Sequence, residues 1–230
     1  AIAFLKENKP MPMTWSFSYK AAKPWEILAI TFTNKAANEL KERIAAKLCD
    51  ETSGVWAGTF HSVCGKILRR FGDRIGYSSN FTIYDTDDQK RLVKDIMKQK
   101  KKKKKVLNVK TVINAISSAK DKLITPAQYA QTIGNDLRLK MIAAVFSEYE
   151  ERLLTADAMD FDGMISNTVK LFSENSDVLD YYAEKFRYIM VDEYQDTNHA
   201  QYVFVKQLAS KHKNICVVGD DDQSIYRFRG

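Results

Sequence analysis

Hydrophobic and polar positions alternate in blocks that predict strands and helices in turn over the first third of the chain. Residues 25–32 form a nearly continuous apolar run, as in parallel strands buried on both faces. A second strand is predicted over 55–60, after the break at Ser53 and Gly54. Apolar residues recur at helical spacing after each strand: Ala36, Ala37, Leu40, Ile44 and Leu48, with Thr33 or Asn34 as cap, and then Val63, Ile67, Leu68 and Phe71. This β-α-β-α order indicates a parallel sheet with right-handed crossovers.

The pattern changes between residues 85 and 184, where apolar residues repeat every three or four positions. No strand pattern stands out there, so the sequence predicts an all-helical insertion. Strand patterns resume at 186–191 and 215–219, with a helix over 200–208 between them. The predicted fold class is therefore α/β, a parallel sheet with helices on both faces, interrupted by a helical subdomain. The predicted divisions are 1–84, 85–184 and 185–230.

Length and composition limit the classes of protein to which this sequence can belong. With 230 residues and 45% hydrophobic content, the chain can bury a full core in one or two domains. No apolar run approaches the ~20 residues of a membrane span. The first residues lack a basic leader and a cleavage site, so the sequence predicts a cytoplasmic protein without membrane contact. The 3 cysteines and 3 histidines have neither ligand spacing nor the pattern of a disulfide framework.

Positive charge is concentrated in one part of the chain. The net charge is +7, and the stretch 85–122 alone holds 13 Lys or Arg against 5 Asp, which gives +8. A localised positive region favours a polyanionic partner, because neutralised phosphates release counterions. The lysine run 100–105 has two readings, a direct DNA contact or a solvated loop, and the sequence leaves both open.

An acidic pair follows one of the predicted strands. Asp192 and Glu193 come directly after the apolar stretch 188–191. Such a pair at the carboxyl end of a strand suits phosphoryl transfer to water, with one acid near Mg²⁺ and the next against the attacking water. An isolated acidic pair is more often a solvated turn, but these acids follow a strand of buried character.

Five segments, in a fixed order, resemble motifs of the superfamily 1 DNA helicases of the UvrD, PcrA and Rep type. Residues 30–37 resemble motif Ia, 58–62 motif Ib, and 159–163 the segment that the family usually writes Leu-Asp-Phe-Asp-Asp. Residues 191–197 resemble motif II and 217–230 motif III. The resemblance implies a RecA-like domain 1A interrupted by helical subdomain 1B.

The resemblance also shows which parts of the family pattern are missing. Residues 1–24 fit neither the glutamine motif nor the phosphate loop that precede motif Ia in the family. Domains 2A and 2B, with motifs IV to VI, have no counterpart in the sequence. The origin of residues 1–24 stays open.

For chemistry, the resemblance implies ATP and Mg²⁺ as cofactors. Asp192 is expected to hold Mg²⁺, generally through water, and Glu193 to polarise the attacking water as general base. Gln223 is expected to contact the γ-phosphate and to relay its presence to the DNA site. Of the acids at 220–222, Asp220 is the one expected to matter at the nucleotide site.

The resemblance further implies single-stranded DNA, and junctions of single and double strands, as partners. Aromatic faces that stack on bases, with donors for phosphates, hold single strands without sequence choice. The expected stacking residues are Phe32, Phe161, Tyr226 and Phe228, and the expected phosphate or sugar contacts are Thr33, Asn34, Thr59, His61, Ser62 and Arg229. Phe228 stands where the family usually has Trp, and Gly163 replaces its second Asp.

The sequence therefore predicts the N-terminal part of an ATP-dependent 3′-to-5′ DNA helicase of repair or replication, without ATPase activity of its own. Repair or replication proteins are possible partners. One alternative is the helicase portion of a RecB- or AddA-like helicase-nuclease. Another is an ATP-independent module that binds single-stranded DNA and has a degenerate nucleotide site.

Overall fold

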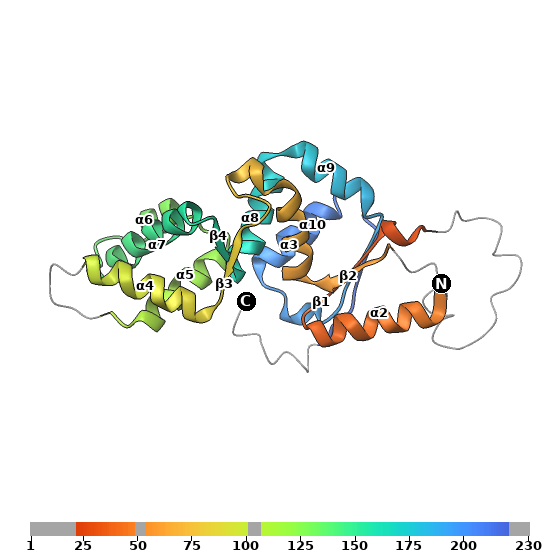
Figure 1. The fold of residues 1–230 in the computed structure, drawn as a ribbon, viewed down its shortest axis with the longest axis horizontal. Coiled ribbons are helices and arrows are strands. Elements are labelled where there is room, and N and C mark those ends of the chain that lie inside the picture. The colour runs from red at the N-terminus through yellow and green to blue at the C-terminus, as the bar shows by residue number, and fades with distance from the viewer. Residues whose placement is uncertain (1–21, 49–53, 101–106, 221–230) are drawn as a thin grey trace, which may run out of the picture.

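A parallel four-stranded sheet forms the centre of one half of the molecule (Figure 1). The computed structural model describes residues 22–48, 54–100 and 107–220. Within them the strands are β1 (Ile27–Thr31), β2 (Trp56–Thr59), β5 (Tyr188–Val191) and β6 (Ile215–Val217). Their order is β2-β1-β5-β6, and every neighbouring pair is parallel. The predicted α/β fold class is confirmed.

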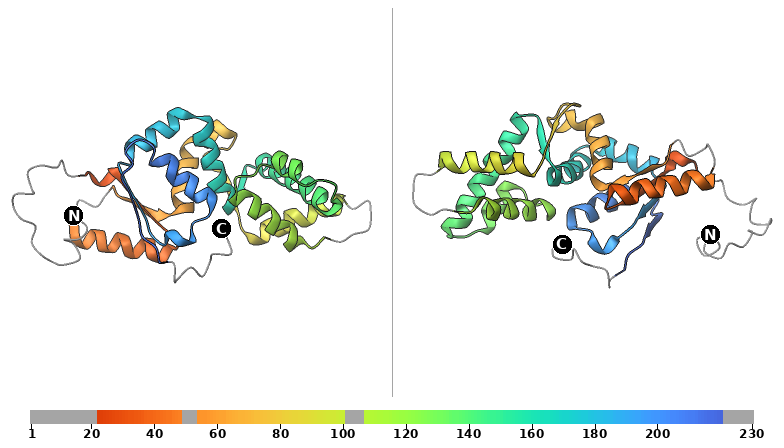
Figure 2. Two further views of the ribbon diagram at one scale, coloured as in Figure 1. Left: turned by 180° about the vertical axis from the view of Figure 1, so that it is seen from behind. Right: turned by 60° about the horizontal axis from the view of Figure 1, so that its bottom comes forward.

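Helices cover the sheet from both sides (Figures 1 and 2). α2 (Asn34–Leu48) lies on one face, while α3 (Phe60–Phe71) and α10 (His199–Leu208) lie on the other. Leu28 and Ile30 of β1 are fully buried in one cluster with Phe60 and Phe204. Each such side chain stabilises the fold by about 1.5–3 kcal/mol relative to an exposed one. Short 3₁₀ helices also occur: η2 (Pro24–Glu26), η4 (Gly72–Ile75) and η5 (Tyr194–Asp196).

The β5–β6 side of the sheet is less covered than the sequence predicted. Tyr188 and Met190 are 38% and 46% exposed, and Ile215 and Val217 of β6 are 44% and 47% exposed. The predicted buried character of the strand over 188–191 therefore applies to one face only, which carries Ile189 and Val191. The reason is that α10 covers one face of β5, burying Ile189 and Val191, while the described residues leave its other face open.

A second, smaller core lies in the helical half of the molecule, on the left of Figure 1. It is built by α4 (Thr86–Lys100), α5 (Val109–Asp121), α6 (Pro126–Thr132) and α7 (Leu137–Thr155). The expectation of an all-helical insertion over 85–184 missed β4 (Ala158–Asp160), which pairs in parallel with β3 (Thr82–Tyr84) where the two halves meet. Three residues per strand are too few to produce a readable alternation.

Two further helices within the predicted insertion pack with the sheet. α8 (Phe161–Glu174) and α9 (Ser176–Lys185) bury Met164, Phe172 and Tyr182 in the cluster that covers the sheet. The boundaries at 85 and 184 stay predictions, and this packing favours an insertion that ends near β4. Among the described residues, no helix has the length and apolar character needed to cross a membrane.

Candidate functional site

The carboxyl ends of the four parallel strands lie along one edge of the sheet, and most of the predicted site residues follow these ends. Phe32 to Asn34 follow β1, His61 and Ser62 follow β2, and Asp192 and Glu193 follow β5. Asp220 lies beyond β6. In open α/β sheets this edge is where ligands bind. Gln223, Tyr226, Phe228 and Arg229 lie outside the described residues, as do lysines 101–105.

The acidic pair sits in an exposed turn that the sheet holds in place. The backbone N–H of Asp192 donates to the Ile30 carbonyl at 2.9 Å, which ties the turn to β1. Glu193 has φ 53°, in the left-handed region. That conformation costs a non-glycine residue about 1–3 kcal/mol and occurs preferentially at functional sites. Both side chains are exposed, so their carboxylates are accessible to a ligand.

Gln195 links this turn to the end of β6. Its Nε2 donates to Glu193 Oε2 at 2.5 Å, and its Oε1 accepts from the Asp220 backbone N–H at 3.0 Å. Tyr194 N–H also donates to the Val218 carbonyl at 2.9 Å. A Cβ at Gly219 would lie 2.7 Å from Gln195 Oε1, so a larger residue there would displace the Gln195 amide. The segments that resemble motifs II and III are thus joined by the Gln195 amide and by backbone hydrogen bonds.

The acids present suit a water-coordinated magnesium ion better than an all-protein metal centre. Among the described residues, no group of three or more His, Cys, Asp or Glu side chains could enclose a metal. Mg²⁺ usually keeps several waters and binds through one or two carboxylates together with substrate phosphates. An exposed Asp192 beside Glu193 fits that role.

The carboxyl ends of β1 and β2 present one aromatic ring and two helix caps. Phe32 is partly buried, and its ring meets Phe60 edge-on at 5.5 Å. The Thr33 hydroxyl accepts from Ala36 N–H at 3.1 Å, so Thr33, and not Asn34, caps α2. The Thr59 hydroxyl accepts from Ser62 N–H at 3.2 Å, and Thr59 is only 7% exposed. Thr59 therefore serves as the cap of α3, whereas Thr33, Asn34 and Ser62 are exposed enough to contact a ligand.

His61 and Phe161 bring motif Ib and the 159–163 segment together. Their rings meet edge-on at 5.4 Å, and Phe161 is 44% exposed. Burial lowers the pKa of His61 below its ordinary value of 6.5, and the charge of Asp162 opposes that shift. His61 therefore presents a neutral ring at neutral pH.

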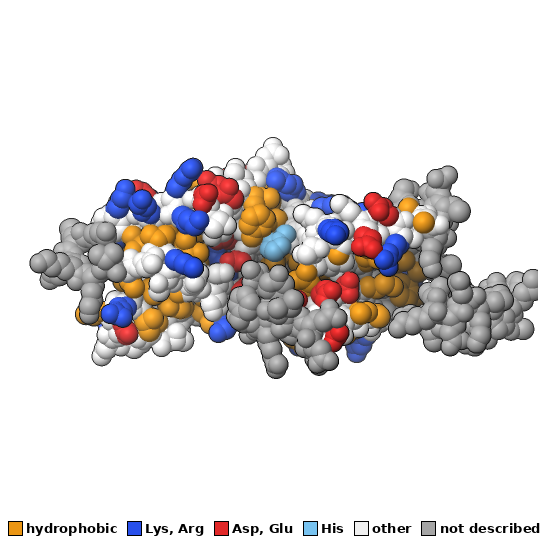
Figure 3. All heavy atoms as spheres, turned by 90° about the horizontal axis from the view of Figure 1, so that it is seen from below, with side chains coloured by type: hydrophobic (Ala, Val, Ile, Leu, Met, Phe, Trp, Pro, Cys, Tyr) orange, Lys and Arg blue, Asp and Glu red, His pale blue; other side chains and the backbone are white. Residues whose placement is uncertain are grey.

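On the face seen in Figure 3, lysine and arginine side chains lie among hydrophobic ones over the helical half.

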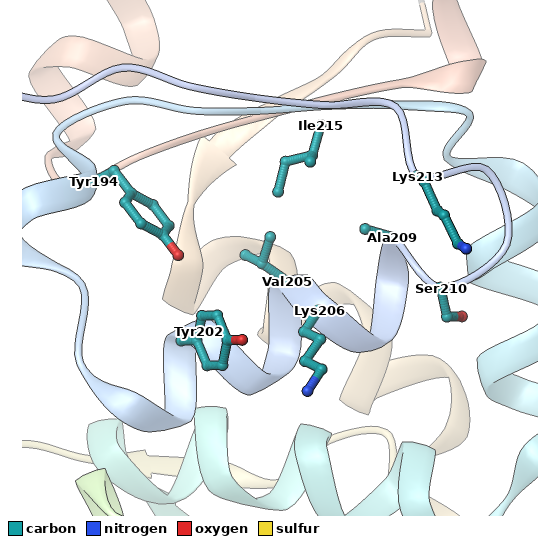
Figure 4. A pocket seen from close by; sticks show the side chains of 8 residues that line it. All are labelled: Tyr194, Tyr202, Val205, Lys206, Ala209, Ser210, Lys213 and Ile215. Atoms are coloured by element: carbon teal, nitrogen blue, oxygen red, sulfur yellow. The ribbon is translucent and has the colours of Figure 1, made fainter.

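A hollow of about 390 Å³ lies between the acidic turn and α10 (Figure 4). Tyr194 and Tyr202 stand at one end of it, and Ile215 of β6 faces Val205 of α10 across it. Lys206 and Lys213 also contribute to the lining. The lining is largely apolar, so the hollow does not resemble a phosphate site.

A buried polar cluster lies behind Phe161. Lys120 Nζ donates to both oxygens of Asp160 at 2.8 Å and lies 2.6 Å from Glu150 Oε1. The Tyr149 hydroxyl donates to Asp160 Oδ2 at 2.7 Å. Burial alone would raise the pKa of Asp160, but the charge and hydrogen bonds of Lys120, together with the hydrogen bonds from Tyr149 and the Gly163 N–H, hold that pKa below its ordinary value. The sequence gives no sign of this cluster, because a lysine in a basic stretch is by default a surface residue.

Comparison with known proteins places these features in a family. The sequence profile of the UvrD/REP helicase N-terminal domain matches residues 13–230. The chain belongs to this family. The ATP-dependent DNA helicase PcrA of Staphylococcus aureus is 51% identical over 211 residues, and that of Bacillus subtilis is 48% identical over 211 residues. Each match covers 92% of this chain but only 29% and 28% of the respective relative.

Membership of the UvrD/REP family confirms the resemblance inferred from the five motifs. The parallel sheet with helices on both faces agrees with the RecA-like core of that family. The chain spans less than a third of the length of these relatives.

Proposed function

We propose that this chain is the N-terminal part of an ATP-dependent helicase that moves 3′ to 5′ along single-stranded DNA in repair or replication. One observation carries the proposal. The exposed Asp192–Glu193 turn is bonded to β1, whose end presents Phe32 and Thr33. Acids for phosphate chemistry and an aromatic face for bases thus share one sheet edge. The PcrA relatives, which are named ATP-dependent DNA helicases, support the same conclusion.

On the nucleotide side, Asp192 would hold Mg²⁺ through water, and Glu193 would accept a proton from the attacking water. Bound ATP supplies the phosphoryl group, and Mg²⁺ neutralises its charge. Gln195 holds the Glu193 carboxylate through its 2.5 Å hydrogen bond and so orients the base. Gln223 and Asp220 are the proposed sensors of the γ-phosphate. Because no phosphate loop is present in this sequence, we expect negligible ATP turnover by the isolated chain.

On the DNA side, Phe32 and Phe161 would stack on bases, together with Tyr226 and Phe228. The proposed contacts to phosphates or sugars are Thr33, Asn34, His61, Ser62 and Arg229. Thr59 serves as the N-cap of α3. Stacking on aromatic rings distinguishes bases from one another poorly, because every base has a π-face. We therefore expect binding without sequence preference.

Other parts of the proposal concern the complete protein. Domains 2A and 2B would complete the nucleotide site, and strand junctions and repair or replication proteins would be its partners. Relatives at 48–51% identity that are named PcrA favour this reading over a RecB- or AddA-like helicase-nuclease.

Titration of this chain with fluorescent oligo-dT tests the DNA side. Phe32→Ala should weaken binding by the ~1–3 kcal/mol of one stacked base, about 5- to 150-fold. Trp25→Ala is the matched control, because Trp25 is 49% exposed and precedes β1 at the opposite end. Equal affinity of wild type and Phe32→Ala would refute the stacking site. Tight binding by wild type, with no ATP hydrolysis by the complete protein, would favour the ATP-independent module.

A further inference from the structure

The C-terminal end of α5 forms hydrogen bonds with the beginnings of two other helices. Ser117 Oγ donates to Asp162 Oδ2 at 2.6 Å, and Lys120 donates to Asp160, the N-cap of α8. Asn198, the N-cap of α10, donates through Nδ2 to Asp121 Oδ1 at 2.7 Å. Three residues of α5, Ser117, Lys120 and Asp121, thus hold both helix starts.

These two helix starts adjoin the two halves of the candidate site. Phe161 is the first residue of α8 and contacts His61. Asn198 comes directly after η5 and Thr197, the loop that begins with Asp192 and Glu193. The end of α5 is therefore bonded on one side to Asn198, which follows the carboxylate loop, and on the other side to the two aspartates that flank Phe161.

The turn that ends α5 fixes it in both cores. Leu123 has φ 58°, where glycine is usual. Its N–H donates to the Lys120 carbonyl at 2.9 Å, and Ile124 N–H donates to the Ala119 carbonyl at 2.8 Å. Ala119 is buried in the helical core, while Leu123 packs against the cluster that covers the sheet. A glycine would relieve the backbone but would lose that packing, which explains why a strained leucine stands there.

We propose that the end of α5 couples the carboxylate loop to Phe161, with Ser117 and Asp121 as positioning residues. The meaning of the coupling rests on the proposed function, because it would connect nucleotide chemistry with DNA contact. The coupling itself is a property of this chain. It requires that a structural change at the beginning of one helix also alter the beginning of the other helix.

Amide hydrogen exchange measured by NMR tests the coupling without DNA. Gly163 N–H donates to Asp160 Oδ1 and Gln201 N–H to Asn198 Oδ1, so these two amides report on the two helix starts. Asp121→Ala should speed exchange at both amides by about 2- to 10-fold, the effect of losing one hydrogen bond. Ser117→Ala should do the same from the other side.

Two further variants separate coupling from a general destabilisation of the fold. Asp121→Asn keeps an oxygen acceptor for Asn198 and should restore slow exchange at both amides. Asp177→Ala, which breaks the exposed ion pair with Arg74, should change neither amide. Exchange that rises only at the nearer helix start, or equally in Asp177→Ala, would overturn the proposal.

Added oligo-dT separates this proposal from the proposed function. In wild type it should slow exchange at Gln201 as well as at Gly163, and in Asp121→Ala only at Gly163. Slowing at Gln201 that persists in Asp121→Ala would also overturn the coupling. If oligo-dT does not bind at all, the DNA function is wrong, and the DNA-free exchange rates still decide whether α5 couples the two helix starts.

Discussion

Asp160 and Asp192 have similar positions relative to a strand, but one is buried and the other is exposed. Each lies at the end of a short parallel strand, Asp160 in β4 and Asp192 after β5. Asp160 is 2% exposed, and its two oxygens accept from Lys120, Tyr149 and Gly163. Asp192 is exposed, and one of its oxygens accepts from the next backbone N–H at 3.0 Å.

This difference separates a structural acid from an acid open to a ligand. A carboxylate offers about four lone-pair positions, and the bonds to Asp160 use that capacity. No coordination position is left there for a metal or a water nucleophile. Asp192 and Glu193 keep such positions accessible, in a turn with a strained backbone. Burial and pairing, rather than the Asp residue itself, therefore show where chemistry is possible.

The largest effect is expected at the exposed acids, Asp192 and Glu193. In a complete protein that carries the missing motifs, Glu193→Gln should lower ATP hydrolysis by about 10²–10⁴-fold, because it removes the general base while keeping the shape of the side chain. ATP binding should change little, since Glu193 acts on water. Steady-state hydrolysis and nucleotide titration measure the two quantities. A parallel loss of binding would place Glu193 in the binding shell instead.

At the paired acid, Lys120→Met should destabilise this chain by about 3–5 kcal/mol, because it leaves Asp160 buried without its positive partner. Urea unfolding gives the change in free energy. Lys170→Met is the matched control. Lys170 forms an exposed pair with Glu174 at 4.0 Å, and its loss should cost less than about 1 kcal/mol. Similar losses in the two variants would contradict the structural role of the cluster.

A smaller effect is expected from alkaline pH. Burial, and then the charge of Asp160, raises the pKa of Tyr149 above its ordinary value of 10.0. The folded chain then keeps a proton that the unfolded chain releases, so this stabilisation is present below pH 10.0 and is lost as pH rises above it. Tyr149→Phe should therefore reduce the fall in unfolding free energy above that pH. An unchanged slope would show that Tyr149 titrates normally in the fold.

The sheet was predictable from sequence because its strands and helices have clear periodicity. β1, α2 and α3 lie within a few residues of the predicted positions, and the sheet is parallel as predicted. The hydrogen bond that places the acidic pair beside β1 is seen only in the structure. Roles at Gln223, Tyr226, Phe228 and Arg229 stay predictions.

Features that depend on tertiary contacts could not be predicted. Lys120 lies in a basic stretch, and only the fold reveals that it is buried between Asp160 and Glu150. α8 and α9 have the same helical periodicity as α4 to α7, so nothing in the pattern indicated that they pack with the sheet. Exposure of Met190 depends on what covers the second face of β5, which a single strand pattern does not contain.

Replacing each of the two aspartates by asparagine, and measuring the unfolding free energy of both variants in urea, tests the central claim most directly. Asp160→Asn removes the charge opposite buried Lys120 and should cost about 3 kcal/mol or more. Asp192→Asn changes an exposed side chain and should stay within about 0.5 kcal/mol of wild type. Equal losses, or a larger loss at Asp192, would contradict the assignment of Asp160 to structure and of Asp192 to ligand binding.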